Sequence, residues 1–323
     1  MPEIQTAISP VPTSAQALER ALLWDLADGW HTHLDVLVSA DEISDVTRAT
    51  YKQGFDRFVR YVEHCPTVSE NVILDWIADL RVQGAKPSSI NTWLAGVRSM
   101  FKWAHAKAGL TFDPTQGVRG ARRKNTTKRH RREVLTDAEM GMVLAAPPDT
   151  VIGKRDAAII HLMAFTAART VEIWRADLEN LKTEQGRLVL YVHGKGHADA
   201  DDLIVIANPG AQTSLYEWLA ERGQVAGPLF TSFSARTRGD RLSRSYIRRL
   251  VKGYFKSVGV LGANKTTHSL RHTAATSAIR HGATVQQAQV MLRHANISTT
   301  MIYFHETDRV DHPAEDFIHY GEE

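Results

Sequence analysis

Six side chains that can act on a phosphate group lie in the last quarter of the sequence: His268, Arg271, His272, Arg293, His294 and Tyr303. Arginine offers a fixed fork of donors that matches two phosphate oxygens, and its charge persists at all physiological pH values. Histidine exchanges a proton near neutral pH, and tyrosine is a nucleophile that forms a stable covalent ester. These residue types together indicate a site for phosphoryl transfer.

The spacing of these residues indicates how they are positioned. His268 and Arg271 are three residues apart, so they share one face at the start of a predicted helix. A turn-like stretch follows His294, and one of the residues 298–300 is predicted to cap a new helix. Tyr303 is then expected in the first turns of that helix, beside an N-terminus that attracts anions.

The order H-x-L-R-H, L-x-H and T-T-x-x-Y-x-H resembles the signature of the tyrosine recombinase (phage integrase) family. The resemblance implies that His268, Arg271, His294 and Tyr303 are catalytic. It covers the region from residue 169 to Tyr303, and a weaker helical resemblance extends back to about residue 39.

The same family pattern implies two further catalytic residues upstream. One is an arginine in a T-G-L-R-x-x-E-like helix, which the sequence supplies as Arg169. The other is a lysine on a β-hairpin, which the sequence supplies as Lys195 between two glycines. Glu172 corresponds to an acid that supports the catalytic site in the family.

The sequence departs from the family pattern at three places. Alanines occupy positions 167 and 168, where Gly-Leu is usual, and Arg293 stands where glycine is usual. After Lys195, where further basic residues are usual, the sequence has Asp199, Asp201 and Asp202. Acids repel a phosphate, so they are expected to point away from it or to pair with arginine. Arg293 is expected to contact the phosphate or to pair with one of these acids.

The resemblance implies that Tyr303 attacks a DNA phosphate, forms a 3′-phosphotyrosyl link and releases a 5′-hydroxyl. Arg169 and Arg271 would stabilise the phosphorane, and Lys195 would protonate the leaving oxygen. No cofactor and no metal are expected, because arginines supply the positive charge of a two-metal site. The H-x3-H spacing of His268 and His272 lacks the further ligands that zinc requires.

Two other functions remain open from the residues. A type IB topoisomerase uses similar chemistry to relax supercoils without joining two sites. A catalytically silent DNA-binding or architectural protein is the second alternative, and the acids after Lys195 favour it. The complete set of six residues favours a site-specific recombinase. Integration, excision and resolution of a mobile element or a DNA dimer all remain open as its role.

Length and composition set broad limits. The 323 residues, 43% of them hydrophobic, are enough for two domains. The single cysteine, Cys65, excludes an intramolecular disulfide and fits a reducing compartment. No apolar run approaches 18 residues, and residues 1–11 lack the pattern of a secretory signal. We therefore expect a cytoplasmic protein associated with the nucleoid and not with a membrane.

Positive charge is concentrated in residues 119–132, which contain eight basic residues and no acid. This segment has no apolar periodicity, so it is predicted to be a linker that crosses a DNA backbone. Its contacts would be mainly to phosphate. The basic residues are Arg119, Arg122, Arg123, Lys124, Lys128, Arg129, Arg131 and Arg132.

Periodicity predicts a mainly α fold with a small β-sheet, and the family resemblance implies that its two domains form a DNA clamp. After a tail at 1–12, four helices near 13–30, 44–65, 69–83 and 87–109 predict a compact helical domain at 13–118. The resemblance implies that this is the core-binding domain. The linker at 119–132 leads to an α+β catalytic domain at 133–323. Its helices are expected near 136–145, 152–167, 210–222 and 243–258, and its strands near 178–182, 188–193 and 203–206.

Two helices carry candidate DNA contacts, although a solvated face explains each of them equally well. The fourth helix carries Asn91, Arg98, Lys102 and Lys107, and the helix at 243–258 carries Arg244 and Arg248. The family resemblance implies a double-stranded DNA site, a free monomer and a homotetramer when two sites are paired. An accessory DNA-binding protein is a further expected partner, and the C-terminal residues are expected to dock on a neighbouring protomer.

Overall fold

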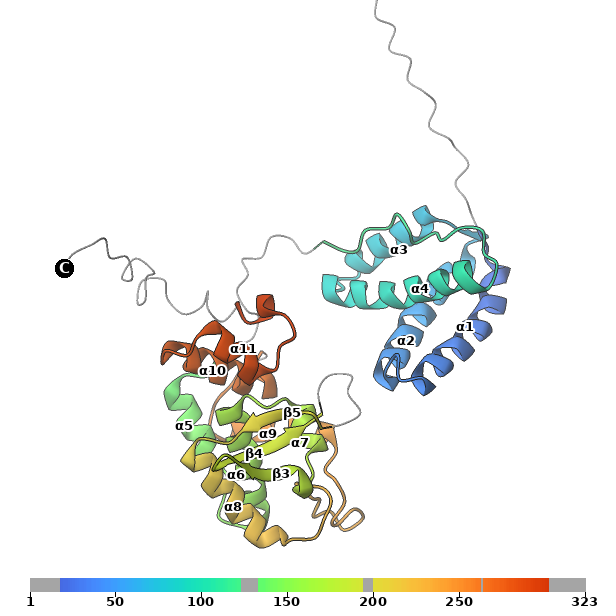
Figure 1. The fold of residues 1–323 in the computed structure, drawn as a ribbon. Coiled ribbons are helices and arrows are strands. Elements are labelled where there is room, and N and C mark those ends of the chain that lie inside the picture. The colour runs from blue at the N-terminus through green and yellow to red at the C-terminus, as the bar shows by residue number, and fades with distance from the viewer. Residues whose placement is uncertain (1–17, 123–132, 194–199, 263, 302–323) are drawn as a thin grey trace, which may run out of the picture. The chain divides into compact units, whose positions relative to one another are not determined.

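The computed structural model describes residues 18–122, 133–193, 200–262 and 264–301. The chain divides into two compact units, Met1–Thr126 and Thr127–Glu323 (Figure 1). Across the described ranges, no helix combines the length and apolarity needed to cross a membrane. The predicted tail at 1–12 and the C-terminal docking segment lie outside the described residues.

Within residues 18–122, the N-terminal unit contains four α-helices, as predicted, although the first begins at Ala21 and not near residue 13. They are α1 (Ala21–Ser39), α2 (Asp45–Tyr61), α3 (Glu70–Val82) and α4 (Pro87–Lys107). Ser44 caps α2 by accepting a hydrogen bond from the Thr47 amide, and a proline opens α4. The sequence did not predict β1 (Leu18–Glu19), which pairs antiparallel with β2 (Thr67–Val68) before the first helix.

The core of this unit is built from large aromatic side chains contributed by all four helices. Trp30 of α1 packs edge-on against Phe55 of α2, with ring centroids 5.1 Å apart. Phe58 packs in the same way against Trp76 of α3, and it also contacts Phe101 of α4. Each helix therefore contributes its apolar stripe to one core.

Among its described residues, the C-terminal unit combines seven α-helices with a three-stranded antiparallel sheet in the order β3-β4-β5 (Figure 1). The strands are β3 (Leu181–Glu184), β4 (Arg187–Val192) and β5 (Asp202–Val205). The helices are α5 (Asp137–Ala145), α6 (Val151–Thr166), α7 (Thr170–Arg175), α8 (Pro209–Arg222), α9 (Arg244–Ser257), α10 (Thr267–Arg280) and α11 (Val285–Leu292). The mainly α fold with a small sheet is thus confirmed.

The first predicted strand starts later than expected. Residues 178–180 form a 3-10 turn, and β3 begins only at Leu181. The predicted turn before β4 is confirmed, because Gln185 and Gly186 have positive φ angles of 47° and 76°. A two-residue hairpin turn with positive φ at both central residues has a twist that matches that of the two flanking strands.

Helix α6 is the central element of the C-terminal unit, because α5, α7, α8 and α10 all contact it. It buries an ion pair between Arg155 and Asp156, whose side chains are 1% and 7% exposed. Tyr246 of α9 accepts a hydrogen bond from Arg155, and Tyr254 donates one to Asp156. This network joins α9 to α6, so the helix with the candidate groove contacts is fixed to the core.

Candidate active site

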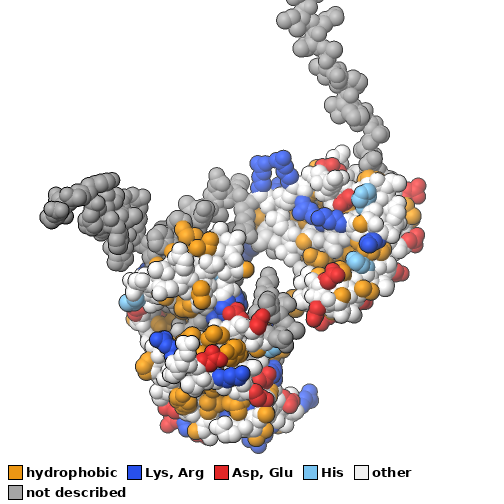
Figure 2. Space-filling view, viewed as in Figure 1, with side chains coloured by type: hydrophobic (Ala, Val, Ile, Leu, Met, Phe, Trp, Pro, Cys, Tyr) orange, Lys and Arg blue, Asp and Glu red, His pale blue; other side chains and the backbone are white. Residues whose placement is uncertain are grey.

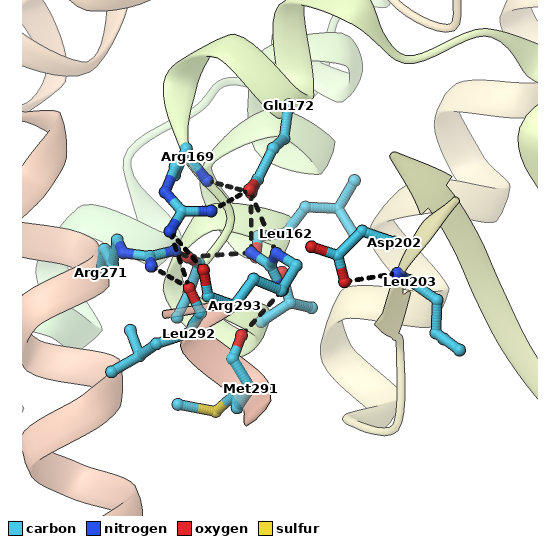
Figure 3. A network of polar contacts seen from close by, with 11 residues as sticks. Leu162, Arg169, Glu172, Asp202, Leu203, Arg271, Met291, Leu292 and Arg293 are labelled. Carbon is cyan, nitrogen blue, oxygen red and sulfur yellow. Dashed lines mark hydrogen bonds and ion pairs between the residues drawn. The ribbon is translucent and has the colours of Figure 1, made fainter. Parts of the chain in front are cut away.

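Arg169 and Arg271 meet at the C-terminal ends of two helices (Figure 3). Arg169 Nη2 donates to the carbonyl oxygens of Leu292 (3.0 Å) and Arg293 (2.8 Å). Arg271 Nη2 donates to the same Leu292 oxygen, and Arg271 Nη1 donates to the Ala167 oxygen at 2.5 Å. The last carbonyls of a helix lack partners within the helix and favour cations. The ends of α6 and α11 therefore hold the two guanidinium groups.

Both helix ends are turned by a residue in the left-handed conformation. Ala167 follows α6 with φ 54°, and Arg293 follows α11 with φ 50°. This conformation favours glycine, because a Cβ atom crowds the backbone there. The two positions are those where the family pattern has glycine, so the backbone geometry explains the family's preference.

Glu172 is shared between two arginines. Its Oε1 accepts from Arg169 Nη1 at 2.7 Å, and its Oε2 accepts from the Arg169 amide at 2.6 Å. Arg293 donates to the same carboxylate through Nε at 3.1 Å and Nη2 at 2.7 Å. Burial opposes ionisation of Glu172, but the hydrogen bonds and charges of Arg293 and Arg169 outweigh it and lower its pKa. Glu172 is therefore ionised and orients Arg169.

The expectation that Arg293 pairs with one of the acids after Lys195 is wrong for the described residues Asp201 and Asp202, because its carboxylate partner is Glu172. The Arg293 side chain is only 4% exposed and is turned inward onto Glu172 (Figure 3). The αL turn directs it back across the end of α11, where Nη1 also donates to the Met291 carbonyl at 2.7 Å. Arg169 is different, since 28% of its side chain remains exposed.

His294, the residue after Arg293, is held by hydrogen bonds to its backbone and to its ring. Its amide donates to the Gln289 carbonyl at 3.2 Å, and Gln289 Nε2 donates back to the His294 carbonyl at 3.0 Å. The ring Nδ1 lies 2.9 Å from Thr300 Oγ1. Burial, followed by the charges of Arg271, Arg169 and Arg293, lowers the pKa of His294 to about 4. The imidazole is therefore neutral at physiological pH.

His268 lies in the first turn of α10, three residues before Arg271, as predicted. A buried hydrogen bond from Thr170 Oγ1 to Thr267 Oγ1 (3.1 Å) joins the start of α7 to the start of α10. This bond fixes the start of α7, next to Arg169, relative to the start of α10, which carries His268. His272 is 1% exposed and belongs to the interior of the unit.

The structure brings together Arg169, Glu172, Arg271 and His294, while Lys195 and Tyr303 lie outside the described residues. Asn296 caps a 3-10 turn at Ile297–Thr299 by accepting a hydrogen bond from the Ser298 amide. Met301, directly after the predicted cap residues 298–300, is helical, and the residues that follow it lie outside the described ranges.

Two of the candidate DNA contacts on α4 have a role inside the N-terminal unit. The Asn91 side chain accepts from the Ala121 amide (2.7 Å) and donates to its carbonyl (3.2 Å). Arg98 donates to the Val118 carbonyl at 2.5 Å. Val118 and Ala121 are both 4% exposed and belong to the core. The first residues of the basic segment are therefore packed on α4.

The remaining described candidates reach solvent to different degrees. Arg119, Arg122, Lys102, Lys107 and Arg248 are exposed, and Arg244 is half-buried. On the face seen in Figure 2, basic and acidic side chains are interspersed on the C-terminal unit. The other basic residues of the linker lie outside the described ranges: Arg123, Lys124, Lys128, Arg129, Arg131 and Arg132.

Three parts of the site were not predicted. The carbonyl groups of Ala167 and Leu292 orient both arginines, and no sequence pattern marks a backbone acceptor. Thr300, with no exposed surface, contacts the His294 ring. It lies within the T-T-x-x-Y stretch, which is the one sequence signal that pointed to it.

Comparisons with known proteins point to one family. Residues 133–309 match the phage integrase family, and residues 31–108 match the phage integrase N-terminal SAM-like domain. The tyrosine recombinase XerD of Pseudomonas putida is 28% identical over 282 residues, which cover 84% of this chain and 90% of that protein. The tyrosine recombinase XerC of Thermodesulfovibrio yellowstonii is 28% identical over 272 residues, covering 81% and 86%.

Solved structures show the same fold. The XerH site-specific recombinase bound to its palindromic difH substrate superposes with a TM-score of 0.69 at 18% identity, covering 88% of this chain and 84% of that one. A lambda integrase dimer on a core site gives a TM-score of 0.64 at 16% identity, covering 84% and 96%. With two family domains matched over most of its length, the chain belongs to the phage integrase family of tyrosine recombinases, enzymes that break and rejoin DNA strands.

Proposed function

We propose that this chain recombines specific DNA sites through a 3′-phosphotyrosyl intermediate on Tyr303. The observation that carries the proposal is the convergence of Arg169 and Arg271 on the Leu292 carbonyl, directly beside His294. Arg169 precedes α7, Arg271 lies in α10 and His294 follows α11, so the three residues come from separate helices. The fold brings two positively charged guanidinium groups and a neutral imidazole close together. Such a group of donors can stabilise the negative charge of a phosphorane.

In the proposed reaction, the Tyr303 oxygen attacks a DNA phosphorus in line. A phosphorus–oxygen bond to Tyr303 forms, the bond to the 5′-oxygen breaks, and a 5′-hydroxyl leaves. Arg169 and Arg271 donate to the non-bridging oxygens, where negative charge accumulates in the transition state. Their anchoring by helix-end carbonyls fixes both guanidinium groups before the substrate binds, so little reorganisation is needed.

Proton transfer is assigned to the remaining residues of the set. His268 accepts the proton of Tyr303, and Lys195 protonates the leaving 5′-oxygen. His294 donates a hydrogen bond to a non-bridging oxygen through Nε2, a role that suits a neutral imidazole whose other nitrogen is held by Thr300. The covalent ester conserves the energy of the broken bond, so rejoining needs neither ATP nor a cofactor.

DNA binding is assigned to both units. The core-binding domain would occupy residues 13–118 and the catalytic domain residues 133–323, with the basic segment lying along the DNA backbone between them. Exposed Arg119 and Arg122 would contact phosphates, and Arg248 on α9 would face the major groove. Four copies on two DNA sites would complete recombination, which places the protein at the nucleoid during integration, excision or resolution.

A nicked duplex tests the proposal, because the cut fragment diffuses away and rejoining fails. The site is obtained first, by enriching a randomised duplex library for binding to Tyr303→Phe. Denaturing gels then measure the covalent adduct with the original chain and with Tyr303→Phe, in buffer containing EDTA. We expect an adduct that requires Tyr303 and persists with EDTA.

Each alternative gives a different result in this assay. Binding without an adduct would identify a silent DNA-binding protein and refute the proposal. An adduct accompanied by relaxation of supercoiled plasmid, without exchange between two sites, would identify a topoisomerase. Joining of two sites in a Tyr303-dependent reaction is the outcome that the proposal requires.

A further inference from the structure

Arg293 occupies a backbone position that disfavours it. It ends α11 with φ and ψ both at 50°, the left-handed conformation in which glycine is the usual residue. A long charged side chain at such a position is strained by its backbone and is retained only where its contacts outweigh the strain. Its side chain is also 4% exposed, so solvent does not stabilise its charge.

Arg293 makes its paired hydrogen bonds with a single side chain, Glu172. Nε and Nη2 form two hydrogen bonds with the two oxygens of Glu172, at 3.1 Å and 2.7 Å. Nη1 donates to the Met291 carbonyl at 2.7 Å, which sets the guanidinium plane against the end of its own helix. Paired donors of this kind hold a carboxylate in one orientation. Glu172 is therefore fixed from one side by Arg293 and from the other by Arg169.

The balance of charge explains why a second arginine matters here. Glu172 and Arg169 alone would form a neutral pair, in which the carboxylate offsets the charge that Arg169 offers to a phosphate. Arg293 adds a positive charge on the other side of Glu172. Arg169, Glu172 and Arg293 together therefore carry a net charge of +1. In a buried site this difference is weakly screened and acts over a short distance.

We infer that Arg293 is a positioning residue for the proposed cleavage reaction: it shares the Glu172 carboxylate, holds it against Arg169 and offsets its negative charge. Arg293 does not touch the substrate, and it acts on the reaction through Glu172 and Arg169. The inference rests on the proposed function, since it assigns Arg169 to the phosphate.

Single-turnover cleavage of the nicked duplex tests this inference in the full chain. We expect Arg293→Gly to bind DNA within about twofold of the original chain and to cleave at least about tenfold more slowly. Arg293→Lys keeps the charge but loses the paired donors, so its rate should lie between the two. Gln185→Gly is the matched control, because it removes another left-handed side chain, with φ 47°, from an exposed turn. It should cleave at the original rate.

Rescue by a second substitution separates the inferred role from simple structural support. Glu172→Gln removes the charge that Arg293 offsets, so the double variant Arg293→Gly/Glu172→Gln should cleave faster than Arg293→Gly alone. Thermal melts of all variants show whether they are folded. If Arg293→Gly does not fold, the rate of Arg293→Lys tests the inference in its place. A rate for Arg293→Gly equal to that of Gln185→Gly, or a double variant showing both losses multiplied, would overturn the inference. Absence of any adduct with the original chain would refute the proposed function and this inference together.

Discussion

The Nδ1 atom of His294 lies 2.9 Å from the Oγ1 atom of Thr300, a residue with no exposed surface. A neutral imidazole carries one proton, on either Nδ1 or Nε2. If the Thr300 hydroxyl donates to Nδ1, the proton stays on Nε2, where it can be offered to a phosphate oxygen. In that arrangement, Thr300 selects the tautomer that the proposed reaction uses.

Replacing Thr300 tests that assignment. Thr300→Val keeps the shape but removes the hydroxyl, so Nδ1 loses its partner and the imidazole no longer has a fixed tautomer. We expect single-turnover cleavage to slow about tenfold, with DNA affinity unchanged, as for loss of one positioned group. Thr300→Ser keeps the hydroxyl and should cleave nearly as fast as the original chain. Equal rates for the valine and serine variants would show that the hydroxyl has no role.

The lowered pKa of His294 predicts how cleavage depends on pH. Burial and three neighbouring arginines lower that pKa to about 4, so the ring stays neutral from pH 8 down to about pH 5. We therefore expect no loss of single-turnover cleavage from His294 between pH 8 and pH 5.5. The ¹³C shifts of the His294 ring, assigned with His294→Gln, report its titration directly. A midpoint near the ordinary value of about 6.5 would contradict this prediction.

The same pKa carries a prediction about stability. The folded value lies below that of the unfolded chain, so the unfolded chain binds a proton first as the pH falls. The contribution of His294 is therefore fully present above about pH 6.5 and is lost as the pH falls toward 4. Urea titrations at pH 7.5 and pH 5.0 should show a smaller loss of stability for His294→Gln than for the original chain. An equal loss in both would show that His294 does not titrate differently on folding.

Much of the active site could be predicted from the sequence, because its side chains have types that few other sites combine. Arg169, Arg271 and His294 were expected to act together, and the fold places them around one helix end. The direction of Arg293 was not predictable. It depends on a left-handed turn that reverses the side chain, and the sequence shows only that glycine is absent.

The fold was predictable where apolar periodicity was strong, as in the four helices of the N-terminal unit. It was less predictable where short segments depend on partners distant in sequence. Leu18 pairs with Val68, so strand β1 exists only because β2 does. The packing of Ala121 likewise depends on Asn91, about 30 residues earlier. Local composition indicated a linker there and could not reveal this contact.

Close packing of α2 on α4 leads to a further prediction about stability. A Cβ atom at Gly96 would lie 2.2 Å from the Tyr51 carbonyl oxygen, and one at Gly54 would lie 2.4 Å from the Trp93 carbonyl oxygen. Both neighbours are helix backbone, which cannot move aside cheaply. We expect Gly96→Ala to destabilise the N-terminal unit by about 1–3 kcal/mol, the usual cost of overpacking.

A second glycine provides the control for that substitution. A Cβ atom at Gly141 of α5 meets nothing within 4 Å, so Gly141→Ala should gain about 0.5–1 kcal/mol from better helix propensity. Urea unfolding followed by circular dichroism measures both variants. A Gly96→Ala chain as stable as the original would mean that the two helices separate easily, and that their close approach does not define the core.

The exposed arginines at the start of the basic segment predict how DNA binding depends on salt. Asn91 holds Ala121 on α4, while Arg119 and Arg122 on the same stretch remain exposed. If each contacts one phosphate, Arg119→Gln/Arg122→Gln should flatten the plot of log affinity against log salt by about 1.8, since each contact contributes about 0.9. Arg81→Gln, an exposed arginine on α3, is the matched control and should leave the slope unchanged. The slope of log affinity against log salt depends on the number of phosphates that the protein neutralises. An unchanged slope for the double variant would therefore show that Arg119 and Arg122 do not contact the DNA.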